Sequence, residues 1–306
     1  MRKILYLAAL LIAAAACAGN ETRKSDESRD SVVINTDSLA FPMPVVPDSI
    51  SSREGKLRYV ALHYWDSMDF NDTTRSLRDD IMEQNFSNFT LILSSLSEAG
   101  GDGVDEAFST LLTHASVNPR VLGKVRDIAR LYLAEPDSPM RDDALWVVFI
   151  DAVLRGGYAD EALSLRLANE RERAVKNMPG TKAADFEYVT ADGKKSRLSA
   201  TPAGTESLMV FFYDPTCEAC EETLSKMKND ASITDAVKGG RMKILAVAAK
   251  GTKPEWEAAL WKFPDDWTVG FNTDGIDQRE VYAFPSLPSI YILSPDLTVV
   301  AKDINY

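Results

Sequence analysis

The strongest constraint on this 306-residue chain is an apolar run at 208–213 (LMVFFY) with two cysteines close behind it. A short continuous apolar run of this kind is typical of a strand buried on both faces of a parallel sheet. Pro215 helps to end the strand, and the acidic residues after Cys217 suit the first turn of a helix. The run therefore predicts an α/β arrangement in which Cys217 lies where a strand passes into a helix.

Strand and helix patterns alternate after Pro179-Gly180. A second apolar run at 244–249 predicts another buried strand, and helices are expected at 217–229 and 254–262. The end of the chain reads as two antiparallel strands, 289–293 and 297–301. We therefore expect an α/β domain with a mixed central sheet over 178–306.

Residues 51–177 follow a helical period instead. Apolar residues recur at spacings of three and four between 75 and 99, and the pattern returns at 122–132 and 145–152. Glycine and proline pairs separate these segments. The chain is thus expected to be an α+β two-domain protein, in which an all-α domain of five or six helices at 51–177 precedes the α/β domain.

The first residues have the pattern of an export signal. Arg2 and Lys3 precede an apolar run at 4–16, which is shorter than the roughly 18 to 20 residues that a membrane span needs. The run ends in Ala-Ala-Ala-Cys17, which resembles a bacterial lipobox. We expect residues 1–17 to be a lipoprotein signal peptide with Cys17 lipidated, and the polar, proline-rich segment 18–50 to be a flexible tether. Ordinary signal cleavage, with Cys17 left free or removed, is the alternative.

This pattern predicts a location in the cell envelope of a Gram-negative bacterium, with the lipid anchor in a membrane and the folded part facing the periplasm. Display on the outer surface is a further option. A formal net charge of −12 argues against nucleic acid as a partner, because phosphate binding needs a basic face.

The pair Cys217 and Cys220 admits three interpretations. Zinc usually needs four ligands, and neither His63 nor His114 lies at ligand spacing. A structural disulfide would close a very short loop and restrain little of the unfolded chain. Thiol–disulfide exchange fits best, because a helix N-terminus stabilises a thiolate at Cys217 and Cys220 can reach back to it.

The Cys-Glu-Ala-Cys sequence at 217–220 and the segment 284–293 (FPSLPSIYIL) carry a family resemblance. Through them residues 179–306 resemble the thioredoxin-like fold, specifically the TlpA/ResA-like (AhpC/TSA-related) envelope thiol–disulfide oxidoreductases. The helical region resembles an uncharacterised helical domain that stands between a lipoprotein signal and a thioredoxin-like domain in envelope proteins.

The resemblance implies a role for each site residue. Cys217 would attack a substrate disulfide and Cys220 would resolve the mixed disulfide. Leu287 and a cis Pro288 would bind the substrate strand, and Glu218 and Ala219 would tune the redox potential. The implied activity is a disulfide reductase that needs no cofactor and no metal. Its partners would be disulfide-containing exported proteins and a membrane thiol donor.

Two departures from the family pattern generate further hypotheses. Phe211 occupies the place where thioredoxins bury an aspartate that assists the resolving cysteine, so Asp214 or Glu218 would have to substitute. The chain also stops soon after its last strand, and we hypothesise that the helical domain covers the sheet face left without a final helix. A non-catalytic binding module is the alternative function, and a peroxidase ranks last.

Overall fold

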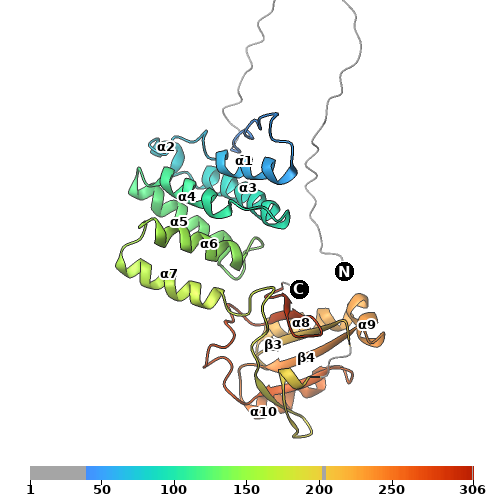
Figure 1. Cartoon of the computed structure of the whole chain (residues 1–306). Helices are drawn as coiled ribbons and strands as arrows, with labels where there is room; N and C mark the ends of the chain where they lie inside the picture. Colours follow the sequence, from blue (N-terminus) through green and yellow to red (C-terminus); the bar gives the residue numbers. More distant parts are fainter. Residues whose placement is uncertain (1–38, 202–204, 305) are drawn as a thin grey trace, which may run out of the picture. The chain divides into compact units, whose positions relative to one another are not determined.

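The computed structural model describes residues 39–201, 205–304 and 306, and residues 39–306 form one compact unit. Cys17 and the predicted signal peptide lie outside the described residues. Across the described part of the chain, every helix is too short or too polar to cross a membrane. We call residues 39–177 the helical domain and residues 178–306 the sheet domain (Figure 1).

Seven α-helices make up the helical domain: α1 (Arg53–His63), α2 (Thr73–Ser76), α3 (Asp79–Glu98), α4 (Val104–Ala115), α5 (Pro119–Leu133), α6 (Asp143–Arg155) and α7 (Glu161–Ala174). Several begin at an aspartate or asparagine whose side chain accepts a hydrogen bond from a first-turn N–H, as Asn118 and Asp142 do. The four-residue α2 is too short to show an apolar period, which is why the sequence predicted only five or six helices.

An aromatic core joins these helices. The ring of Phe89 on α3 lies 5.8 Å from that of Phe108 on α4, and Phe108 lies 5.3 Å from Phe149 on α6. All three side chains are buried. The apolar period read from the sequence is therefore the contact surface between α3, α4 and α6.

One residue of the predicted tether, Phe41, contacts the helical domain. Phe41 is buried in the helical core, and its backbone N–H donates to Asn85 Oδ1 at 2.7 Å. The Asn85 side chain in turn donates to the Leu39 carbonyl at 2.7 Å. Phe41 thus packs into the helical core, and Asn85 binds the backbone groups of Leu39 and Phe41, whereas Met43 and Val45 are exposed; the flexible tether over 18–50 stays a prediction.

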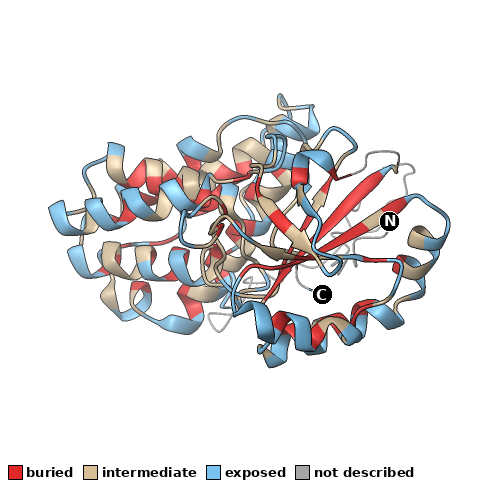
Figure 2. Ribbon diagram, turned by 90° about the horizontal axis from the view of Figure 1, so that it is seen from below, coloured by how far each residue is buried: buried red, intermediate tan, exposed pale blue. Residues whose placement is uncertain are grey.

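The sheet domain contains a seven-stranded sheet with the order β2-β1-β5-β4-β3-β6-β7. Its strands are β1 (Glu187–Thr190), β2 (Lys195–Arg197), β3 (Ser207–Tyr213), β4 (Met242–Ala248), β5 (Thr268–Asn272), β6 (Ser289–Leu293) and β7 (Val299–Ala301). Strands β3, β4 and β5 run parallel, whereas β6 pairs with β3 antiparallel. The predicted mixed sheet is confirmed, and Figure 2 shows its central strands buried.

Helices cover one face of this sheet. They are α8 (Glu218–Asn229), α9 (Ala231–Lys238) and α10 (Lys253–Ala259), with short 3₁₀ turns at Leu198–Ala200 and Leu260–Lys262. The sequence predicted α8 and the α10 region but missed α9 and β5. Strand β5 has only one buried residue, so it lacks the apolar run that marked β3 and β4.

The hypothesis that the helical domain covers a sheet face is wrong. The hydrophobic clusters on the two faces contain no residue from 39–177. Ile304 packs against the cluster on the α8 face, and its N–H donates to the Ile290 carbonyl at 3.2 Å. Ile304 thus adds apolar cover to the α8 face of the sheet.

Polar groups join the two domains instead. Lys302 forms an ion pair with Asp143 at 2.5 Å and donates to the Ala174 carbonyl at 3.0 Å. Arg141 pairs with Asp143 at 2.8 Å and with Asp303 at 3.2 Å. These side chains are 15% exposed or less, so the ion pairs are shielded from solvent.

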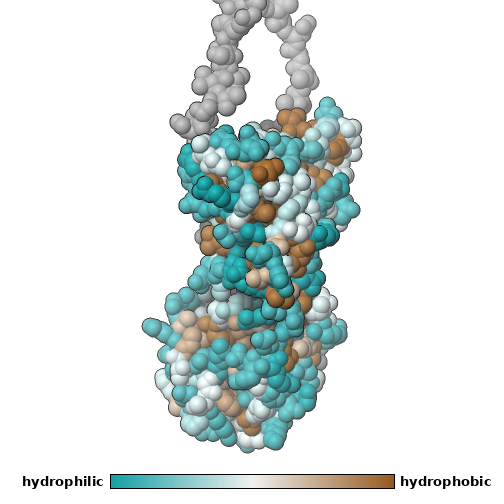
Figure 3. All heavy atoms as spheres, turned by 90° about the vertical axis from the view of Figure 1, so that its left-hand side faces the viewer, coloured by the Kyte–Doolittle hydropathy of each residue, from teal (hydrophilic) through white to brown (hydrophobic). Residues whose placement is uncertain are grey.

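On the face shown in Figure 3, hydrophilic side chains cover most of the surface and hydrophobic ones form small scattered groups.

We expect Phe89→Ala to lower the free energy of unfolding of the helical domain by about 3–5 kcal/mol, because it leaves a cavity between α3 and α4. Urea titration followed by far-ultraviolet circular dichroism measures this change. Leu91→Ala is the matched control, since Leu91 lies on the same helix but is 56% exposed, and its effect should stay within about 0.5 kcal/mol. Equal transition midpoints for the two variants would contradict the packing described here.

Candidate active site

Cys217 occupies the N-cap of α8, directly beyond the carboxyl end of β3. Its Sγ atom accepts a hydrogen bond from the backbone N–H of Cys220 at 3.3 Å. The turn before it is closed by Asp214, whose carboxylate accepts from the Thr216 N–H and hydroxyl at 2.8 Å each. The fully buried β3 therefore places Cys217 where an unpaired helix N–H meets its sulfur.

Cys220 lies one turn into the helix and faces the core. It is 3% exposed, whereas Cys217 is only partly buried, and both are free thiols in this structure. Burial raises the pKa of the Cys220 thiol well above its ordinary range. The two sulfurs thus differ in the way that an attacking and a resolving cysteine must differ, with one accessible and the other shielded.

The segment before β6 forms the opposite wall of the site. The Leu287 carbonyl oxygen lies 3.8 Å from Cys217 Sγ, although 70 residues separate the two positions. The Leu287–Pro288 peptide bond is cis, as the resemblance implied. The next residue, Ser289, pairs with Phe212 of β3, so the antiparallel β3–β6 register brings this segment to the cysteine.

The acidic residues of the first helical turn are partly neutralised. Glu221 forms an ion pair with Lys262 at 2.6 Å, and Glu222 pairs with Lys226 at 2.9 Å. Glu218 is exposed and has no ion-pair partner among the described residues. Ala219 is exposed as well. Among Glu218, Glu221 and Glu222, only Glu218 has a carboxylate that is not paired with a lysine.

The interior behind the cysteines is apolar except for two polar atoms that sequence reasoning missed. Phe211 is fully buried and shares its hydrophobic cluster with Cys220. The Tyr213 hydroxyl and Trp256 Nε1 are both buried there and interact with each other. Tyr213 and Cys220 interact electrostatically, and burial raises the pKa of that tyrosine. Tyr213 ends an apolar strand, and nothing in the sequence indicated that its hydroxyl would lie behind the cysteines.

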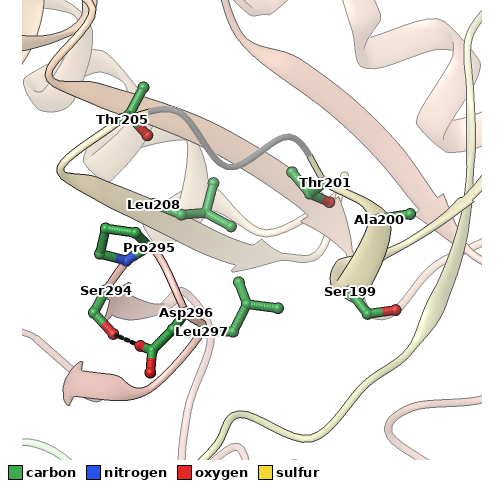
Figure 4. A pocket seen from close by; sticks show the side chains of 9 residues that line it. All are labelled: Ser199, Ala200, Thr201, Thr205, Leu208, Ser294, Pro295, Asp296 and Leu297. Carbon is green, nitrogen blue, oxygen red and sulfur yellow. Dashed lines mark hydrogen bonds between the residues drawn. The ribbon is translucent and has the colours of Figure 1, made fainter.

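No large pocket lies against the cysteines. The cavity that both cysteines line has a volume of about 10 Å³, room for one water molecule at most. A larger pocket of about 360 Å³ lies elsewhere on the sheet domain, between the turn around Ser199 and the β6–β7 hairpin (Figure 4). There the Ser294 hydroxyl donates to the Asp296 carboxylate at 2.6 Å. None of the predicted site residues lines it.

The described residues contain no group of three or more histidine, cysteine, aspartate or glutamate side chains that could bind a metal ion. The arrangement of a partly accessible thiol, a buried second thiol and a backbone carbonyl beside them suits thiol–disulfide exchange on a polypeptide.

Comparisons with known proteins give a family and a fold. A family model described as a domain of unknown function (DUF5106) matches residues 16–177, just over half of the chain. A comparison with curated proteins gives no match. A crystal structure of a thioredoxin-like protein from Bacteroides caccae is 27% identical, with a TM-score of 0.76, and the match covers 87% of this chain and 94% of that chain.

Two shorter matches cover less than half of this chain. A conserved protein of unknown function from Bacteroides fragilis is 33% identical over 42% of this chain and 93% of that chain, with a TM-score of 0.40. A thiol–disulfide oxidoreductase from Bacteroides fragilis is 23% identical over 41% of this chain and 92% of that chain, with a TM-score of 0.35. The thioredoxin-like fold assignment therefore rests on the Bacteroides caccae match, which spans both domains.

At pH 7 we expect iodoacetamide to alkylate Cys217 faster than Cys220 by roughly tenfold or more, because Cys220 is buried and its pKa is raised. Mass spectrometry of tryptic peptides over time measures the two rates. The urea-unfolded chain is the control, in which both thiols should react at similar rates. Similar rates in the folded protein would contradict the assignment of an accessible and a shielded thiol.

Proposed function

The chain belongs to the DUF5106 family, and we propose that it is a thiol–disulfide oxidoreductase that works through Cys217 and Cys220. The observation that carries this proposal is the position of Cys217 Sγ, 3.3 Å from the Cys220 N–H and 3.8 Å from the Leu287 carbonyl. The thioredoxin-like fold supports it, because this geometry sits at the end of the central parallel strands of that fold.

The reaction follows from the difference between the two sulfurs. The Cys217 thiolate attacks one sulfur of a client disulfide, and the other client sulfur leaves as a thiolate that takes a proton from water. Cys220 then gives up its proton and attacks Cys217 Sγ. A Cys217–Cys220 disulfide forms, and the second client sulfur leaves. Two electrons have passed from the protein to the client, and an external thiol must return them.

The Leu287 backbone and Pro288 hold the client in this scheme. An extended client segment lies along residues 286–288 and pairs with the Leu287 backbone, which keeps the disulfide beside Cys217. The proton of Cys220 has few acceptors, since Phe211 replaces a buried aspartate. The Asp214 carboxylate lies on the turn before Cys217, where it accepts from Thr216, and we propose it as the proton acceptor of Cys220.

The direction of electron transfer and the cellular location belong to the same proposal. We assign the protein as a reductase of exported, disulfide-containing proteins, because Lys262 and Lys226 only partly offset the glutamates that disfavour a thiolate. The export-signal pattern that ends at Cys17 supports a lipid anchor in the bacterial envelope. A membrane thiol donor then re-reduces the cysteine pair.

Replacement of the resolving cysteine tests this function. Cys220→Ala is expected to accumulate clients as mixed disulfides on Cys217, because the second step can no longer release them. Expression of the full chain in its own cell envelope, acid quenching and non-reducing electrophoresis with mass spectrometry measure the adducts. Cys217→Ser should form none and should lose the reduction of a model protein disulfide.

Ser225→Ala serves as a matched control, since Ser225 is an exposed residue on the same helix and should leave the activity unchanged. Absence of adducts on Cys220→Ala, together with no disulfide reduction by the unaltered protein, would overturn the proposal. That outcome would favour a non-catalytic binding module on a thioredoxin-like scaffold.

A further inference from the structure

A pocket of about 230 Å³ lies where the helical domain meets the sheet domain. Its walls come from α5, α6 and α7 and from Ala283 and Pro285 of the segment that leads to the cis proline. Trp146, Pro136 and Ala134 give it an apolar side. Its volume suits one amino-acid side chain and is below the range of cofactor or drug-sized ligand sites.

Arg141 and Arg173 both line this pocket but differ in exposure. Arg141 Nε is buried and lacks a hydrogen-bond partner within the described part of the chain. The Arg173 side chain, which is exposed at the rim, forms no ion pair there either. Arg141 Nε is closed off from the pocket, whereas the exposed Arg173 guanidinium offers donors that an occupant with acceptor atoms can meet.

The remaining charges of the pocket are already satisfied. Arg130 pairs with Glu135 at 3.1 Å and with Glu170 at 2.8 Å. The Asp143 carboxylate forms ion pairs with both Arg141 and Lys302. The carboxylates that line the pocket are thus paired with Arg130, Arg141 or Lys302, and the lining cation left without an ion pair among the described residues is Arg173.

The pocket lies close to the reacting sulfur. Pro285 is two residues before Leu287, whose carbonyl is 3.8 Å from Cys217 Sγ. Even a fully extended chain spans at most about 7 Å over two residues, so Pro285 lies within that distance of Leu287. A client segment that lies beside Leu287 therefore reaches the pocket with a side chain about two to four residues from its own cysteine.

We propose that this pocket is a client subsite that binds an acidic side chain, aspartate or glutamate, about two to four residues from the client's disulfide cysteine. Arg173 supplies the donors, and Trp146 and Pro136 contact the aliphatic part of the side chain. The helical domain thereby selects among clients of the sheet domain. This inference rests on the proposed function.

The buried ion pairs at the domain junction make the subsite possible. Arg141 and Lys302 hold α6 against the strand end at Asp303, and the Ser289 hydroxyl donates to Asp303 at 2.6 Å. Ser289 directly follows the cis proline. The wall from the helical domain is therefore tied to the same residues that position the client strand. Arg141 is unsuitable as a test residue, because its replacement would also disturb this junction.

Single-cysteine peptides activated as 2-thiopyridyl disulfides test the subsite. In the Cys220→Ala protein, attack by Cys217 releases 2-thiopyridone, and its absorbance gives a second-order rate constant. Glutamate is placed at each position within four residues of the peptide cysteine, with a glutamine peptide as the partner in each case. At one position two to four residues away, we expect the glutamate peptide to react about threefold to fivefold faster, the ratio for a half-exposed ion pair.

Charge reversal separates recognition from a structural effect. Arg173→Gln should bring the glutamate-to-glutamine ratio to one, and Arg173→Glu should make a lysine peptide the fastest. Arg120→Gln is the matched control, since Arg120 is exposed on α5, forms no ion pair among the described residues and lies outside the pocket, and the ratio should persist.

The outcomes distinguish the two levels of the proposal. If no peptide reacts with Cys217, the proposed function fails. If glutamate and glutamine peptides react equally at every position, the subsite is wrong while the oxidoreductase assignment stands. A ratio that survives Arg173→Gln would also overturn the subsite.

Discussion

The antiparallel pairing of β6 with β3 is the contact on which the rest of the site depends. It aligns Ser289 with Phe212 and so carries the Leu287 carbonyl to within 3.8 Å of Cys217 Sγ. Backbone hydrogen bonds between two buried strands are hard to shift, because a one-residue slip would turn every buried side chain to the wrong face. The reactive sulfur therefore lies beside a rigid wall that can hold a polypeptide.

The junction between the domains depends on charge instead of apolar area. Lys302, Arg141, Asp143 and Asp303 are largely shielded from solvent, and burying such groups is costly unless each finds its partner. A network of this kind adds little net stability but permits only one geometry. We infer that it orients the helical domain relative to the cis-proline segment, which is what a client subsite between the domains requires.

Burial separates the roles of the two thiols, and charge adjusts the balance between them. Cys220 is shielded among apolar side chains, with Phe211 in the same cluster, so its proton is hard to remove. Around Cys217 the helix N–H favours the thiolate, while Glu218 opposes it. Small electrostatic effects of opposite sign therefore decide the redox potential of the cysteine pair. A difference of about 30 mV in that potential changes the equilibrium constant of thiol–disulfide exchange tenfold.

The sequence alone determined the two-domain order, the mixed sheet and the buried strand before Cys217, because these depend on local apolar patterns, whereas the cis state of Pro288 was expected only from the family resemblance. Tertiary structure alone decided the rest. Strand β5 has only one buried residue, Phe41 is buried against Tyr64, Trp65 and the Asn85 side chain from distant parts of the chain, and the pairing of Arg141 with Asp303 joins residues 162 positions apart. Partners so distant are set by how the domains pack, which no local pattern records.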